Sequence, residues 1–132
     1  MTLFQAIPKQ DKLEHIIQKS VELGVSKIVP VLTRRCVSRP DKKDFEKKLV
    51  RLNKIALEAA KQSGRGIIPT VEPMISFDEA IIQMKEYDCP AMLYEEGGIR
   101  FSELNTQEKK SFALFVGSEG GFDESEAEAA RE

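Results

Sequence analysis

The chain has 132 residues, of which 41% are hydrophobic and 32% charged, the composition of one soluble globular domain with a single core. No apolar run approaches the length of a membrane-spanning helix and no signal-peptide pattern opens the sequence, so we expect a cytoplasmic protein with no membrane segment. The formal net charge of −2 by itself argues against a nucleic-acid binder.

The first part of the chain predicts two strands with a helix between them. Residues 2–7 predict a short strand, and residues 27–32 form an apolar run that suits a strand buried on both faces of a parallel sheet. Between them, the spacing of apolar residues predicts a helix with Asp11 as its N-cap and Gly24 just beyond its end.

A basic loop and a long helix come next. Residues 33–43 are polar and basic and predict an exposed loop. Asp44 is the expected N-cap of a helix that ends near Gln62, before a break at residues 63–66. Residues 34–65 carry eleven Lys or Arg against four Asp or Glu, whereas residues 66–132 carry five against fifteen. This segregation favours either one basic face or a solvated lysine-rich helix.

The next elements follow the same alternation. Residues 67–71 predict a short strand near a sheet edge, because Pro69 lacks a donor for the sheet. A capping box of Ser76 and Glu79 predicts a helix through Glu86. Residues 89–94 predict another strand.

The last part of the chain contains the strongest strand pattern, at residues 111–116, after a loop expected at 95–98. A glycine loop follows directly, and Asp123 is the expected cap of a final helix, with Glu126 three residues on. We therefore predict an α/β fold with a mostly parallel sheet and helices on both faces. Because the sequence stops inside this helix, we expect a domain that is incomplete at its C-terminus.

The glycine loop at residues 117–121 joins a buried strand to a helix N-terminus, a position where α/β proteins bind ligands. It has neither the Walker A pattern nor GxGxxG. Glu119 in its middle argues against a polyphosphate, so the loop suits a neutral or cationic ligand. The alternative is a tight turn that binds nothing.

The cysteines and the histidine give no metal pattern. Cys36 and Cys89 lack CxxC spacing and cannot form a standard zinc site with His15. We expect two reduced thiols and a structural histidine.

Four stretches, in order along the chain, resemble one family. Residues 116–122 (VGSEGGF) are similar to the IGPEGGF loop of the SPOUT-class 16S ribosomal RNA uracil-N3-methyltransferases, the RsmE group. Residues 12–25 (KLEHIIQKSVELGV) resemble its KATELGV helix, and residues 58–65 (EAAKQSGR) resemble its EAAEQSGR segment. Residues 33–37 (TRRCV) resemble its RSV loop, with cysteine in place of serine.

The resemblance implies a knotted α/β methyltransferase domain over residues 1–132, a homodimer, S-adenosylmethionine as methyl donor and ribosomal RNA of the small subunit as substrate. It also implies an N-terminal RNA-binding domain of PUA type and a C-terminal knot segment, neither of which is in this sequence. Ser118 stands where the family has proline, which loosens the loop but keeps its glycines.

Site residues follow from the same resemblance. We expect the cofactor to contact the glycine loop and the end of the preceding strand, namely Leu93, Tyr94, Glu95, Val116, Gly117, Ser118, Glu119, Gly120 and Gly121.

Three arginines and one carboxylate are the candidate catalytic residues. Arg34, Arg35 and Arg65 could contact RNA phosphates or stabilise the uracil oxyanion, because a guanidinium suits both tasks. Glu119 joins them, although it could instead cap the following helix. Arg34 and Arg35 could instead be ordinary surface charges, and Arg65 together with Gln62 could close a helix end. The identity of the catalytic base stays open.

Two functions remain as alternatives to the methyltransferase. One is a non-catalytic RNA-binding or assembly module that keeps the scaffold. The other is a different nucleotide-binding α/β enzyme, which would need a phosphate loop that this sequence lacks.

Overall fold

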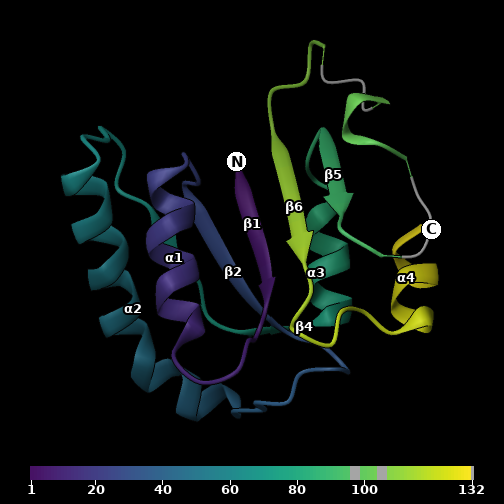
Figure 1. The fold of residues 1–132 in the computed structure, drawn as a ribbon, viewed down its shortest axis with the longest axis horizontal. Helices are drawn as coiled ribbons and strands as arrows, with labels where there is room; N and C mark the ends of the chain where they lie inside the picture. The colour runs from purple at the N-terminus through teal and green to yellow at the C-terminus, as the bar shows by residue number, and fades with distance from the viewer. Residues whose placement is uncertain (96–98, 104–106, 132) are drawn as a thin grey trace.

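A computed structural model of the chain describes residues 1–95, 99–103 and 107–131. Its centre is a sheet in which every strand pairs parallel with its neighbours, in the order β3-β2-β1-β6-β5, with β4 also pairing with β2 (Figure 1). The strands are β1 (Thr2–Ala6), β2 (Lys27–Leu32), β3 (Thr70–Val71), β4 (Ile75–Ser76), β5 (Cys89–Met92) and β6 (Phe112–Val116). All their carboxyl ends therefore meet at one edge of the sheet.

Helices cover both faces of this sheet. They are α1 (Lys12–Glu22), α2 (Lys42–Gln62), α3 (Phe77–Met84) and α4 (Glu124–Arg131), with a short 3₁₀ turn at Phe101–Glu103. The pair α1 and α2 lies on one side, and α3 lies on the other with α4 beside it (Figure 1). The predicted parallel sheet with two covered faces is confirmed.

Two apolar clusters explain why the central strands read as continuous apolar runs. Leu3 of β1 and Ile28 of β2 pack in the cluster beneath α1 and α2. The next residue of each strand, Phe4 or Val29, points to the opposite face and packs in the cluster beneath α3. Because successive side chains alternate between faces, both must be apolar in a strand covered on both sides. Each fully buried large side chain stabilises the fold by roughly 1.5–3 kcal/mol.

Aromatic rings build the second cluster. Phe115 of β6 lies edge-on to Phe122, with ring centroids 4.8 Å apart, and stacks on Phe77 of α3 at 5.7 Å. Phe122 directly follows the glycine loop, so this contact fixes the end of that loop against the core.

The structure corrects two helix starts. The N-cap of α2 is Asp41 and not Asp44: the Asp41 carboxylate accepts a hydrogen bond from the backbone N–H of Asp44 at 2.7 Å. Asp11 does occupy the N-cap position of α1, but its side chain makes no capping hydrogen bond. The capping box of Ser76 and Glu79 is confirmed at α3.

Several other boundaries differ from the sequence prediction. Only Thr70–Val71 forms a strand in the predicted segment 67–71, and the helix after Ser76 ends at Met84 instead of Glu86. The strand expected at 89–94 stops at Met92, and β4 was not predicted. Residues 96–98 of the expected loop 95–98 lie outside the described residues.

The loop after β2 is less exposed than expected. Thr33 and Cys36 are buried, and the Cys36 sulfur accepts a hydrogen bond from the Thr33 backbone N–H at 3.4 Å. This contact folds the loop back on the core. Both Cys36 and the half-buried Cys89 are free thiols, and His15 lies exposed on α1.

Candidate functional site

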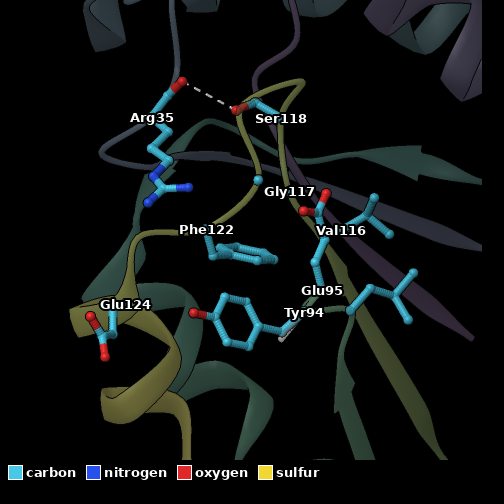
Figure 2. Close-up of a pocket in the computed structure, with 10 residues that line it drawn as sticks. Arg35, Tyr94, Glu95, Val116, Gly117, Ser118, Phe122 and Glu124 are labelled. Carbon is cyan, nitrogen blue, oxygen red and sulfur yellow. Dashed lines mark hydrogen bonds between the residues drawn. The ribbon is translucent and has the colours of Figure 1, made fainter. Parts of the chain in front are cut away.

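A cavity of about 420 Å³ lies at the carboxyl edge of the sheet, where the segments after β5, β6 and β2 meet. Figure 2 shows the side chains that converge on it. Ligands of open α/β sheets bind at this edge, and the volume is within the range of small-molecule sites. The lining residues are Arg35, Leu93, Tyr94, Glu95, Val116, Gly117, Ser118, Gly121, Phe122 and Glu124.

The glycine loop forms one wall of this cavity as a tight turn. The backbone N–H of Gly121 donates to the carbonyl of Ser118 at 2.9 Å, and Gly121 has a φ of +69°. A side chain is strained at such a positive φ, so glycine suits this position. At Gly117 a Cβ atom would lie 3.1 Å from two backbone atoms of Gly121. The turn therefore closes only with glycine at its base.

Residues of β1, of the loop after it and of the start of α1 hold the turn in place. The buried side-chain amide of Gln5 donates to the carbonyl of Gly117 at 3.4 Å. On the other side of the turn, the Glu119 carboxylate accepts the backbone N–H of Lys9 at 2.9 Å and forms an ion pair with Lys12 at 3.4 Å. Glu119 is thus directed to the loop between β1 and α1, and it does not line the cavity.

The environment of Glu119 favours its ionised form. The hydrogen bond from the Lys9 backbone N–H is the main cause that holds the pKa of Glu119 below its ordinary value, and Lys12 adds to it. The ionised carboxylate therefore joins the glycine loop to the loop between β1 and α1.

Arg35 reaches the cavity from the loop after β2. Its guanidinium donates to the carbonyl of Gly120 at 3.1 Å and lies 3.9 Å from the Asp123 carboxylate. Its own carbonyl accepts from the Ser118 hydroxyl at 3.3 Å (Figure 2). A Cβ at Gly120 would lie 3.2 Å from Arg35 Cβ. The close approach of these two segments explains the glycine at 120.

Arg34 turns to α4 and does not line the cavity. Its guanidinium donates to the Ser125 hydroxyl at 2.8 Å and pairs with Asp123 at 3.3 Å. The Ser125 side-chain hydrogen bond is the main cause that lowers the pKa of Asp123, and Arg34 and Arg35 lower it further. The Arg34 side chain therefore binds the N-terminal end of α4.

Arg65 lies at the other edge of the sheet. Its guanidinium donates to the carbonyls of Val21 and Val25 at 3.2 and 2.5 Å, at the end of α1 just before β2 begins. Since β2 runs from that edge toward the cavity, the structure does not bring Arg65 together with Arg34 and Arg35 (Figure 1).

The cavity gathers most, but not all, of the predicted site residues. Glu119 and Gly120 of the expected cofactor set do not line it, whereas Phe122 and Glu124 do although they were not predicted. Phe122 had a signal in the sequence, because it ends the glycine-loop motif. Glu124 had none, since an acidic residue in the first helical turn is common for dipole reasons alone.

The part of the chain that the structure describes offers neither a metal site nor a membrane-spanning helix. That part contains no cluster of three or more His, Cys, Asp or Glu able to hold a metal ion. None of its helices is long and apolar enough to cross a membrane.

Comparison with known proteins places the chain in a family. The profile of the RNA methyltransferase domain matches residues 1–132. The ribosomal RNA small subunit methyltransferase E of Bacillus subtilis is 38% identical over 133 residues, covering 96% of this chain and 52% of that protein. The chain thus spans about half the length of the curated relatives it matches.

Solved structures agree with the sequence match. The Neisseria gonorrhoeae ribosomal RNA small subunit methyltransferase E, bound to S-adenosylmethionine, has a TM-score of 0.89 and 34% identity over 98% of this chain and 53% of that one. A Legionella pneumophila protein in complex with the same cofactor has a TM-score of 0.90 and 32% identity, with the same coverage of 98% and 53%. The chain belongs to the RNA methyltransferase domain family.

Proposed function

We propose that the cavity binds S-adenosylmethionine and that the protein methylates ribosomal RNA. One observation carries this proposal: a small-molecule cavity stands at the carboxyl edge of a parallel sheet, and two solved structures with a similar fold contain bound S-adenosylmethionine. The proposal covers the whole protein's activity, although the chain spans about half of its relatives.

The chemistry of the lining fits such a cofactor. Gly117 and Gly121 present bare backbone to the cavity, so a ligand can approach the peptide groups closely. The half-buried Tyr94 supplies aromatic surface for a nucleoside, beside the buried ring of Phe122 (Figure 2). When bound, the cofactor supplies an electrophilic methyl group on a sulfonium.

We further propose uridine N3 of the small-subunit RNA as the methylated atom, which rests on the resemblance of the glycine loop and three other motifs. Transfer to N3 requires loss of the N3 proton, which leaves negative charge on the uracil oxygens. Arg35 is the preferred residue to stabilise that charge, because its half-exposed guanidinium lines the cavity. Holding the base in attack geometry could contribute roughly 7–11 kcal/mol to catalysis.

Arg34, Arg65 and Glu119 receive other roles in this proposal. The Arg34 side chain is 70% exposed, so we assign it to RNA phosphates. The Arg65 guanidinium donates to backbone carbonyls, so we assign it to the fold. Neither arginine is assigned to the reacting base. Glu119 supports the glycine loop through Lys9. We propose no general base among them.

The remaining family traits are also part of the proposal. We propose a homodimer in the cytoplasm, and a SPOUT-type domain that includes residues 1–132 and is completed by a knotted C-terminal segment. The homodimer and the SPOUT-type domain rest on the resemblance of the four motifs to the RsmE group, and the location rests on two cysteines that lack a disulfide or zinc pattern.

Methyl transfer to RNA tests the proposal directly. The protein is incubated with S-adenosylmethionine labelled in its methyl group and with small-subunit ribosomal RNA, and the digested RNA is analysed for 3-methyluridine by mass spectrometry. We expect 3-methyluridine, and a loss of at least about tenfold in kcat/KM for Arg35→Ala. Lys85→Ala, which removes the same charge at the far end of α3, is the control.

Two results would contradict the proposal. RNA binding without any methyl transfer would favour the non-catalytic RNA-binding module. Methylation at another atom would keep the enzyme class and overturn the uridine N3 assignment.

A further inference from the structure

We propose that Glu95 gives the cavity a preference for the cationic methyl donor over its uncharged product. This inference rests on the proposed function. The sequence placed a carboxylate in the glycine loop and suggested a neutral or cationic ligand on that ground. The structure turns that carboxylate, Glu119, toward Lys9 and brings Glu95 to the cavity instead.

The Glu95 carboxylate reaches across to the glycine loop. It comes from the segment after β5, and its Oε1 lies 4.0 Å from the position that a Cβ on Gly121 would take. Figure 2 shows the side chain rising from beside Tyr94 toward Gly117. It therefore lies where two walls of the cavity meet.

This carboxylate has no protein partner in the described part of the chain. No hydrogen bond or ion pair joins it to residues 1–95, 99–103 or 107–131. The other charged groups of the lining are placed differently. Arg35 binds the Gly120 carbonyl, and Glu124 lies on the far side of Tyr94 and Phe122 from Glu95 (Figure 2). Glu95 is thus the lining carboxylate that faces the glycine loop, and it is free to attract a ligand there.

The reaction removes a positive charge from the ligand, and this changes the electrostatic attraction between the ligand and the Glu95 carboxylate. S-adenosylmethionine carries one positive charge more than S-adenosylhomocysteine, because its sulfur has three carbon substituents. Transfer breaks the sulfur–methyl bond, leaves the electron pair on sulfur and forms the bond to the acceptor nitrogen, which loses a proton. The product is a thioether, and its attraction to Glu95 is smaller.

The expected size of the effect follows from the exposure of Glu95. Exposed ion pairs change a binding constant by about twofold to fivefold, and the change shrinks as salt screens the charges. A carboxylate in this place favours entry of the donor and release of the product.

Calorimetric titration of the protein with three ligands tests the inference. The ligands are S-adenosylmethionine, S-adenosylhomocysteine and sinefungin, which carries an amine in place of the sulfonium. Glu95→Gln is the variant, because it removes the charge and keeps the shape. Glu128→Gln is the control, since it removes the same charge from an exposed site on α4 that does not line the cavity.

We expect Glu95→Gln to reduce the preference for both cationic ligands over S-adenosylhomocysteine by about twofold to fivefold. The wild-type preference should fall with added salt, and the Glu128→Gln preference should match the wild type. Equal weakening of all three ligands, or no change, would overturn the role of Glu95 and leave the proposed function standing. Failure of the wild-type protein to bind any of the three would overturn both.

Discussion

The buried carboxylate of Glu126 accepts a hydrogen bond from the backbone N–H of Arg34 at 2.8 Å, 92 positions earlier in the chain. Its second oxygen accepts the backbone N–H of Asp123 at 3.0 Å. The Glu126 side chain therefore joins the loop after β2 to the start of α4. Arg35, in the loop after β2, and Phe122, just before α4, both line the cavity, so Glu126 fixes two of the segments that form its walls relative to each other.

Glu126→Ala is expected to destabilise the protein by about 2–4 kcal/mol, because it leaves two N–H groups without their acceptor in a buried place. Glu126→Gln should cost less, since its amide oxygen still accepts one of the two bonds. Urea unfolding followed by circular dichroism measures both. Glu128→Ala on the exposed side of α4 should change stability by less than about 0.5 kcal/mol. Equal losses for the alanine variants at 126 and 128 would refute the fastening role.

Gly117→Ala is expected to weaken binding of S-adenosylhomocysteine by more than about tenfold. An alanine Cβ would lie 3.1 Å from the backbone of Gly121 and 3.3 Å from the Phe122 ring, so the turn must open. Gly66→Ala is the matched control, because a Cβ there meets nothing within 4 Å. Calorimetry gives the affinities, and thermal unfolding shows whether each variant folds. Unchanged affinity in Gly117→Ala would mean that the turn does not border the ligand.

The strands were predictable where both faces of the sheet are covered. Residues 28–31 are buried and had to be apolar to pack on both sides, and the near-continuous apolar run at 27–32 was visible in the sequence. Strand β4 has two residues and leaves no comparable pattern. The predicted N-cap of α2 was wrong for a local reason. Asp41 and Asp44 are three residues apart, and acidic residues suit both the N-cap and the third helical position.

The position of the cavity was predictable from the sequence, but the full set of residues that line it was not. A glycine loop after a buried strand located it at the carboxyl edge of the sheet. The direction in which a loop side chain points depends on the backbone of the turn, which the sequence does not give. Glu119 was therefore expected to line the cavity, whereas it accepts a hydrogen bond from Lys9 outside the cavity. The contact between Glu126 and Arg34 joins residues with no local pattern in common, and only the folded chain reveals it.

The stability of the loop contact at Glu119 should depend on pH. Hydrogen bonding from Lys9 depresses the pKa of Glu119 in the folded state, so the folded protein holds the ionised carboxylate more strongly than the unfolded chain does. This stabilisation is present above the ordinary glutamate pKa and is lost as the pH falls through the lowered one. The melting temperatures of the wild type and Glu119→Gln should therefore differ near neutral pH and converge as the pH falls through the lowered pKa of Glu119. A difference that does not change with pH would contradict this assignment.

Arg65→Ala should affect the fold and leave the cavity unchanged. The Arg65 guanidinium joins the end of α2 to the carbonyls of Val21 and Val25, and its removal should cost about 1–3 kcal/mol in urea unfolding. Lys61→Ala, which removes the same charge from an exposed position in the last turn of α2, should cost less than about 0.5 kcal/mol. Affinity for S-adenosylhomocysteine should equal that of the wild type when measured well below the melting temperature, because Arg65 lies at the opposite edge of the sheet. A stable Arg65→Ala protein with lost ligand or RNA binding would instead restore the functional role that the sequence suggested for this arginine.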